Sequence, residues 1–312
     1  MKHLSISSFE MKRFLKNIVL CGIPMLLFLI VVEAVVRSAP NDYKYKWTYL
    51  EEHSKDIETL VLGNSQSYYG IDCNYLQGNS FNMAMEGQGL LIDDFVLSGF
   101  IDRMTNLDRV IIPISYLSLT QPEAFGSPGR LMQYHIYYKY DSKWYSKDNY
   151  ECLHFTMCSK KIKALVSGKG FRYVDSLGFC NKPTGSFRDE ADETLAWSTG
   201  RNDRLEIANK NALVHMARLC REKDVKMLVV SFPTDISYRK SPYFDSSQMN
   251  HVRQVATDLS EEFENVFFVV WFENPEFEIS DFFDSSHLNG QGAKKFSILL
   301  NSKLEELQID VI

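Results

Sequence analysis

The sequence predicts an α/β fold, a three-layer sandwich with a central parallel sheet, preceded by one N-terminal transmembrane helix. Two observations lead to this prediction. Short apolar runs rich in β-branched residues alternate with longer stretches whose apolar residues recur at helical spacing, a pattern typical of parallel strands buried on both faces and joined by crossover helices. A single long apolar run near the N-terminus adds the membrane segment.

The apolar run covers residues 18–36. Its only charged residue is Glu33, and membrane helices tolerate the Gly22 and Pro24 that it contains. At about 1.5 Å per residue it spans roughly 28 Å, close to the thickness of a bilayer core. A cleaved signal peptide is an alternative, although no Ala-x-Ala site follows the run, and a buried core helix is another.

Basic residues indicate how this helix is oriented. Lys12, Arg13 and Lys16 precede the run, whereas only Arg37 follows it closely. By the positive-inside rule, residues 1–17 are cytoplasmic and the rest of the chain lies outside. We therefore expect a single-pass protein of the inner (cytoplasmic) membrane with a periplasmic or otherwise extracytoplasmic domain.

The remainder is interpreted as a tether, residues 37–55, followed by one domain, residues 56–312. Five strand candidates in that domain are separated by helix-sized intervals: 59–63, 80–85, 109–114, 226–232 and 266–271. Helical patterns occupy 204–223, 250–264 and 290–307. This alternation is what predicts the doubly wound sandwich.

Residues from about 120 to 203 break the alternation. The segment is rich in Tyr, Lys, Ser and Gly, and it is too long for a plain loop in a compact domain. We interpret it as an insertion over one end of the sheet, where it would form a substrate lid. Peripheral structure without a role in the chemistry is the alternative.

Composition argues against several classes of protein. The net charge of −6 provides no basic surface for nucleic acid. The six cysteines form no CxxC motif or Cys/His spacing typical of zinc, and no phosphate-binding loop is present, so we expect neither a metal nor another cofactor. Pairing of Cys152 with Cys158, or of Cys158 with Cys180, stays open.

Two short motifs supply the groups for acyl transfer through a covalent ester. Residues 63–65 read Gly-Asn-Ser directly after the first strand candidate, and such a turn presents Ser65 at the start of a helix whose positive end favours an oxyanion. Asp284 lies three residues before His287, within reach of its Nδ1–H. Nucleophile, base and orienting carboxylate are thus all present. A helix cap for Ser65 and a structural role for His287 are the alternatives.

On these motifs the chain resembles the SGNH (also called GDSL) hydrolase superfamily. Gly63-Asn64-Ser65 is similar to its Gly-Asp-Ser block, with Asn64 in place of Asp as in membrane-anchored relatives, and Asp284 and His287 match its Asp-x-x-His block. The resemblance covers roughly residues 56–307, apart from the insertion. It implies the flavodoxin-like SGNH fold, with Ser65 as nucleophile, His287 as base and Asp284 as its orienting carboxylate.

The resemblance also implies an oxyanion hole. Gly87 and the backbone N–H of Ser65 would donate to the oxyanion, and Asn64 belongs to the same binding group. The family's Gly-x-Asn-Asp block is absent, because the chain reads Ile-Ser-Tyr-Leu-Ser over 114–118. Ser115 is the replacement donor that we expect, since losing one such donor costs on the order of 3 kcal/mol.

With the membrane anchor, the resemblance implies an O-acyl (acetyl) transferase or esterase that modifies a cell-surface polysaccharide or another envelope glycan, with a multi-span membrane acyltransferase as donor partner. In the insertion, Tyr134, Tyr137 and Trp144 are candidates to stack on sugars, with core packing as the alternative. Another hypothesis is a catalytically weak, glycan-binding or scaffold protein of a polysaccharide assembly complex, which the missing Asn favours. A lipid-directed esterase or thioesterase is a third, and it requires a deep apolar pocket.

Overall fold

The computed structural model describes residues 8–141, 143, 145–168, 172–182, 185, 187–196 and 202–309. The chain divides into two compact units. The first consists of Met1–Asn41 and Asp141–Phe171, and the second of Asp42–Tyr140 and Arg172–Ile312. The insertion expected over 120–203 is therefore shared, because only its central part belongs to the first unit.

A long helix dominates the first unit. Helix α1, Ser8–Ser38, is long and apolar enough over Met11–Ser38 to cross a membrane, with a mean hydropathy of 2.7 in its most apolar window. None of that window is buried against the protein. A helix that is apolar on all sides needs an apolar environment, and the exposure of α1 argues against the core-helix alternative.

Glu33, the one charge in the apolar run, has a structural role within the first unit. Its carboxylate accepts hydrogen bonds from the backbone N–H groups of Glu151 (3.1 Å) and Cys152 (2.8 Å) and pairs with Arg37. The short helix η6, Glu151–Leu153, is thereby attached to the end of α1. The unit also contains η5, Lys147–Asn149, and α7, Phe155–Val166. Trp144 lies outside the described residues.

The second unit is built on five parallel strands in the order β2-β1-β3-β4-β5. They are β1 Thr59–Val61, β2 Ser80–Asn82, β3 Arg109–Pro113, β4 Lys226–Ser231 and β5 Val266–Val270. Each coincides with a strand predicted from the sequence, so the predicted fold class is confirmed. This doubly wound order reverses direction between β1 and β3, where open α/β sheets bind their ligands.

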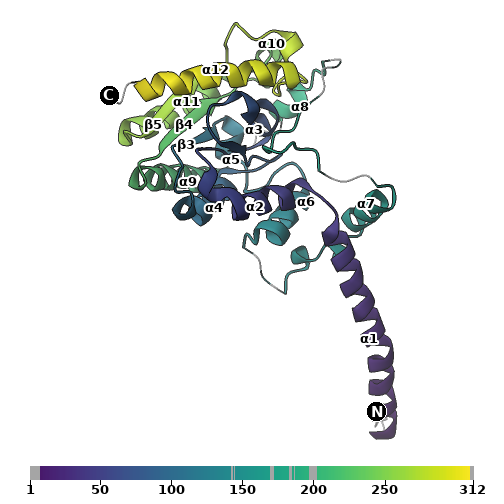
Figure 1. Ribbon diagram of the computed structural model, residues 1–312. Helices are drawn as coiled ribbons and strands as arrows, with labels where there is room; N and C mark the ends of the chain where they lie inside the picture. The colour runs from purple at the N-terminus through teal and green to yellow at the C-terminus, as the bar shows by residue number, and fades with distance from the viewer. Residues whose placement is uncertain are drawn as a thin grey trace. The chain divides into compact units, whose positions relative to one another are not determined.

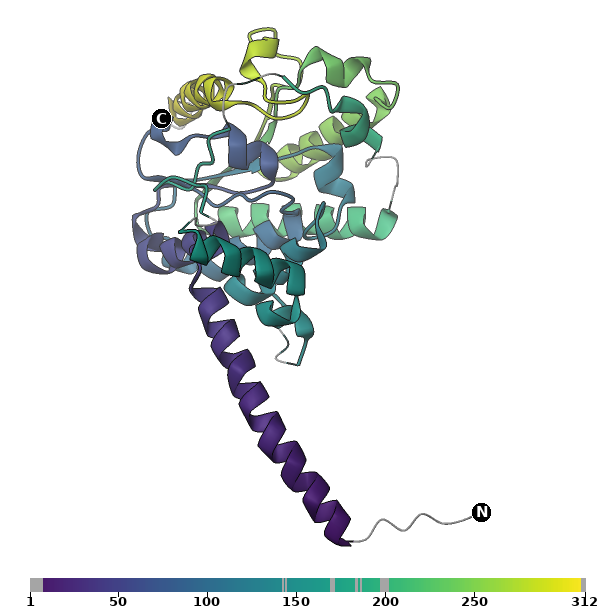
Figure 2. The same cartoon turned by 90° about the vertical axis from the view of Figure 1, so that its right-hand side faces the viewer.

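Helices cover both faces of the sheet. Figure 1 shows α12, Gly290–Ile309, on one side and α2, α4 and α9 on the other, and Figure 2 shows these layers after a 90° turn. Alternate strand residues point to the two layers: Leu60 and Val110 join the core under α2, α4, α9 and α11, whereas Val61 and Ile111 join the core with α12. The helices on the face opposite α12 are α2 (Asp42–His53), α4 (Leu90–Phe100), α9 (Asp203–Glu222) and α11 (Ser246–Glu262).

Shorter helices complete this unit. They are η1 Ser54–Asp56, α3 Ser65–Gly70, η2 Cys73–Tyr75, η3 Ile101–Arg103, α5 Tyr116–Thr120, α6 Pro128–Gln133, the π-helical turn η4 Tyr134–Tyr138, α8 Ala191–Ala196, α10 Ile236–Lys240 and η7 Ile279–Asp281. All six cysteines are free, so neither of the disulfides considered above is formed.

The structure differs from the expected tether over 37–55. Residues 42–53 form α2, whose Leu50 is fully buried in the core and whose Lys46 donates to the carbonyl oxygen of Ala84 at 2.5 Å. Burial lowers the pKa of Lys46 to about 7. The polar and aromatic composition of this segment concealed a helix that packs on the sheet, so the domain begins near residue 42.

In the structure, Tyr134 and Tyr137 of the insertion lie in or against the core, which differs from the sugar-stacking role considered above. The side chain of Tyr134 is fully buried, and its hydroxyl donates to Gln88 Oε1 at 2.9 Å. Tyr137 is partly buried and packs against the same core. Core packing is thus the role of Tyr134.

Candidate active site

A cavity of about 410 Å³ opens where β1 and β3 end. Every site residue predicted from the sequence lines it: Ser65, His287, Asp284, Gly87, Ser115 and Asn64. The insertion contributes as well, through residues on both of its outer parts. The cavity therefore occupies the position that the strand order favours for a ligand.

A tight turn presents Ser65. Gly63 has a φ of +108°, and a Cβ there would approach Pro113 Cγ to 2.1 Å, so only glycine lets the turn after β1 pass against β3. Asn64 then caps α3, its side-chain oxygen accepting the N–H of Gln66 at 2.9 Å. Ser65 follows as the first residue of that helix. Both Asn64 and Ser65 are thus fixed by local hydrogen bonding and packing.

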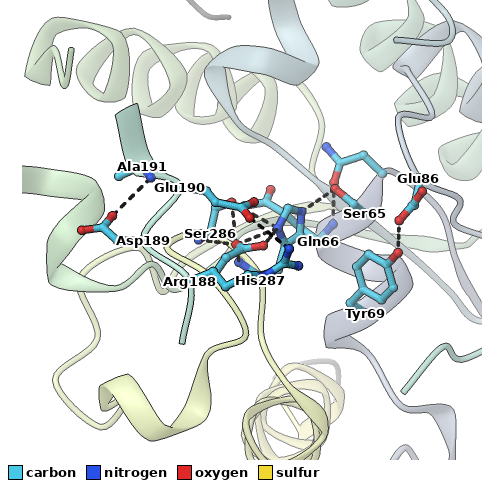
Figure 3. Close-up of polar contacts among 12 residues, drawn as sticks. Ser65, Gln66, Tyr69, Glu86, Arg188, Asp189, Glu190, Ala191, Ser286 and His287 are labelled. Atoms are coloured by element: carbon cyan, nitrogen blue, oxygen red, sulfur yellow. Dashed lines mark hydrogen bonds and ion pairs between the residues drawn. The ribbon is translucent and has the colours of Figure 1, made fainter. Parts of the chain in front are cut away.

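The loop before α12 brings the base to this serine. His287 Nε2 lies 2.7 Å from Ser65 Oγ, and His287 Nδ1 lies 2.9 and 3.0 Å from the two carboxylate oxygens of Asp284. Figure 3 shows the imidazole directed at Ser65. The spacing of three residues between Asp284 and His287 therefore produces the hydrogen bond expected from the sequence.

Asp284 is held as a carboxylate. Burial by itself would raise its pKa, but hydrogen bonds from the His287 imidazole and from the backbone N–H groups of Ser286 (3.0 Å) and His287 (2.9 Å) outweigh it, so the pKa is lowered. An ionised Asp284 accepts the Nδ1–H and leaves Nε2 free to take a proton. This arrangement makes His287 a competent base toward Ser65.

Backbone donors face the same cavity. The N–H groups of Ser65 and Gly87 have no hydrogen-bond acceptor within the part of the chain that the structure describes. Gly87 has a φ of +65°, and a Cβ there would approach the carbonyl oxygen of Phe125 to 2.2 Å, so glycine is required. Both residues can therefore offer an N–H group to an oxyanion.

Ser115 follows β3, in the position where the sequence predicts a replacement oxyanion donor. It caps α5: its Oγ accepts the N–H of Ser118 at 3.2 Å, and its own N–H donates to Ser118 Oγ at 2.8 Å. Accepting this bond leaves the hydroxyl proton of Ser115 available to a ligand. Ser115 thus combines a structural cap with a spare donor at the cavity wall.

A buried network behind the cavity was not predicted from the sequence. Asp93 Oδ1 accepts the backbone N–H of Gly63 at 2.8 Å and the side-chain amide of Gln88 at 2.6 Å. Burial raises the pKa of Asp93 to about 7. One carboxylate thereby joins the turn that carries Ser65 to the turn that carries Gly87. Its position on an amphipathic helix gives no sequence signal for such a role.

Charged and aromatic residues around His287 were also missed. The Tyr69 ring meets the imidazole edge-on at 5.8 Å, and its hydroxyl donates to Glu86 (Figure 3). Lys182 and Arg188 of the insertion line the cavity too. Within the described residues, no group of three or more His, Cys, Asp or Glu side chains could hold a metal ion.

No protein-family model and no curated protein matches the chain. Among solved structures, it is similar to a candidate platelet activating factor from Streptococcus pneumonia, with 11% identity, 92% of this chain and 99% of that chain covered, and a TM-score of 0.44. A GDSL-like lipase from Bacteroides thetaiotaomicron has 11% identity, coverage of 86% and 100%, and a TM-score of 0.43. A candidate acylhydrolase from Bacteroides fragilis has 10% identity, coverage of 83% and 95%, and a TM-score of 0.40.

Proposed function

We propose that the chain is a serine esterase or O-acyltransferase of the SGNH type. The observation that carries the proposal is the continuous relay from Ser65 Oγ through His287 to Asp284, with contacts of 2.7 Å and 2.9–3.0 Å. A nucleophile, a base within hydrogen-bond reach and a group that orients the base are what covalent acyl transfer requires.

The geometry supports a two-step reaction. As Ser65 Oγ attacks an ester carbonyl, His287 Nε2 takes its proton and the carbonyl oxygen becomes an oxyanion, toward which the N–H groups of Ser65 and Gly87 and the Ser115 hydroxyl would donate. The imidazolium then gives the proton to the departing alcohol. Water or a sugar hydroxyl next gives its proton to His287 and attacks the acyl-serine. The imidazolium then returns this proton to Ser65 Oγ as the acyl–Oγ bond breaks, which releases the acid or the acylated sugar.

The proposal also covers the location of the protein, its substrate and its donor partner. The apolar helix α1 supports anchoring in the inner membrane, and the basic residues before it support an extracytoplasmic domain. We propose an envelope glycan, such as a cell-surface polysaccharide, as the substrate, with a multi-span membrane acyltransferase as donor in the transferase case. The charged cavity wall, with Arg130, Lys182 and Glu190, favours a polar substrate over the lipid-directed alternative.

One observation favours a non-catalytic glycan-binding or scaffold protein as second candidate. The third family block lacks its Asn, and the residue at the end of β3 is Ser115, which already serves as a helix cap. The complete relay at Ser65 weighs against this candidate, because glycan binding alone has no use for a buried carboxylate aligned on an imidazole.

Mass spectrometry of the full-length protein in a neutral detergent distinguishes the two candidates. After incubation with p-nitrophenyl acetate, we expect turnover and an acetyl group on the peptide that contains Ser65. Ser65→Ala should lose both while keeping its melting temperature. A well-folded protein that shows neither adduct nor turnover would support the binding or scaffold role.

A further inference from the structure

Charged side chains from the insertion line the candidate catalytic cavity. The cations are Arg130, Lys182 and Arg188, and none of them belongs to the strands and turns that carry the relay. Two have carboxylate partners: Arg130 pairs with Glu86 at 2.9 Å and Arg188 with Glu190 at 3.2 Å. These two pairs leave no net charge for a ligand to meet.

Lys182 is different. Within the described residues its ammonium has no carboxylate at ion-pair distance; instead it lies over the rings of Tyr69 (4.1 Å) and Phe283 (4.6 Å). Its near neighbours outside the described residues, Pro183 and Thr184, carry no charge. Aromatic faces attract a cation and orient it, but they do not neutralise it. Lys182 therefore contributes a positioned, uncompensated positive charge to the cavity.

This charge lies close to the reacting groups. The Tyr69 ring that holds the Lys182 ammonium also contacts the His287 imidazole, edge-on at 5.8 Å. Asp284, the remaining carboxylate of the cavity wall, is only 6% exposed and is hydrogen-bonded to His287 Nδ1, so it forms no ion pair with Lys182. A ligand placed at Ser65 therefore meets one free cation close to the base.

We propose that the substrate carries a carboxylate on the alcohol part of its ester and that Lys182 binds it. A single uncompensated cation matches a group with one negative charge, as on an acidic sugar, better than the dianion of a phosphate monoester. The proposal rests on the proposed function, since it names the substrate class of the same site. The sheet supplies the acyl-transfer groups, and the insertion supplies the recognition of the acidic alcohol.

The test compares two esters that differ by one group. For the full-length protein in neutral detergent, kcat/KM is measured with 4-nitrophenyl acetate and with 3-carboxy-4-nitrophenyl acetate, each relative to its rate with hydroxide. We expect the carboxylate ester to be favoured about fivefold, mainly through KM, which corresponds to one partly exposed ion pair. The preference should shrink near 1 M salt, where screening acts within about 3 Å.

Variants assign the preference to Lys182. Lys182→Gln should bring the ratio of the two corrected values to about one, and Lys182→Arg should retain most of the preference. Lys55→Gln is the matched control, because Lys55 is exposed and does not line the cavity. A ratio that is the same in wild type and Lys182→Gln, or a wild type that favours the neutral ester, would overturn the proposal.

Failure of the proposed function has a separate signature. If neither ester is turned over and Ser65 stays unmodified, the acyl-transfer proposal fails, and the anion site is judged by binding alone. Calorimetry with 3-carboxy-4-nitrophenol and 4-nitrophenol then decides. Tighter binding of the carboxylate compound that is lost in Lys182→Gln would support the site, and equal binding of the two phenols would overturn it.

Discussion

Two buried aspartates stand behind the candidate active site, and their pKa values move in opposite directions. Asp284 accepts hydrogen bonds from the His287 imidazole and from two backbone N–H groups, and its pKa is lowered despite burial. Asp93 receives only neutral donors, the Gly63 N–H and the Gln88 amide, and burial raises its pKa to about 7. For Asp93 burial outweighs its two neutral donors, whereas for Asp284 the imidazole and two backbone donors outweigh burial, so the balance of the two effects decides whether each carboxylate stays ionised.

The difference separates two roles. In the proposed reaction Asp284 would act as a charge, because an imidazolium would form beside it during acyl transfer. Asp93 works as a hydrogen-bond acceptor that fixes the turns of Gly63 and Gly87 relative to each other. A variant that removes the charge but keeps an acceptor oxygen should therefore affect the two positions differently.

Asp284→Asn should have the largest effect. The amide can present its NH₂ to Nδ1 and stabilise the wrong tautomer, so we expect kcat with p-nitrophenyl acetate to fall by about 10⁴-fold, the loss known for this change in serine proteases. Thermal unfolding serves as the control for folding. A variant that keeps more than a tenth of the wild-type rate would show that His287 does not depend on Asp284.

Asp93→Asn should change the pH dependence of stability. A raised folded-state pKa means that the protonated carboxyl favours folding, so this contribution is complete below the unfolded pKa of about 4 and is lost as pH rises through about 7. Up to about 4 kcal/mol of unfolding free energy is involved.

Urea unfolding at pH 5 and pH 8 measures this effect. From pH 5 to pH 8, the unfolding free energy of Asp93→Asn should increase relative to that of wild type, because the variant has no carboxyl group at this position to ionise. Asp258→Asn, at an exposed position on α11, is the control. Parallel pH profiles for wild type and Asp93→Asn would mean that Asp93 does not titrate in this range.

Ser115→Ala should have the smallest effect of the three. If the Ser115 hydroxyl donates to the oxyanion, its loss should lower kcat about 10²-fold with KM little changed, while the Ser65 and Gly87 N–H groups stay in place. Ser115→Asn, which places an amide donor at this position, should reach or exceed the wild-type rate. If both variants match wild type, Ser115 is only a helix cap.

Local patterns predicted much of this molecule. The five strands are continuous apolar runs, and Asp284 and His287 are near neighbours in sequence whose bond follows from one loop. The turn at Gly63 is likewise local. These features depend on a few consecutive residues, which is why sequence reasoning located them.

Long-range packing explains what was missed. The polar and aromatic composition of the segment around Lys46 predicts a tether and does not reveal that the lysine reaches a buried carbonyl. The link from Asp93 to Gly63 spans thirty residues, and Lys182 reaches the cavity from an insertion without periodicity. Such contacts arise only when the sheet has placed the segments together.

The close approach of Gly63 to Pro113 limits the substitutions that the chain can accept at position 63. A position that touches no substrate and bears no reactive group would be among the least replaceable in a saturation library, because any side chain at Gly63 would meet the Pro113 ring. Asn64 and Ser115, closer to the chemistry, have alternatives that keep a cap. Selection on this gene would therefore record the shape of the backbone as strongly as the reaction.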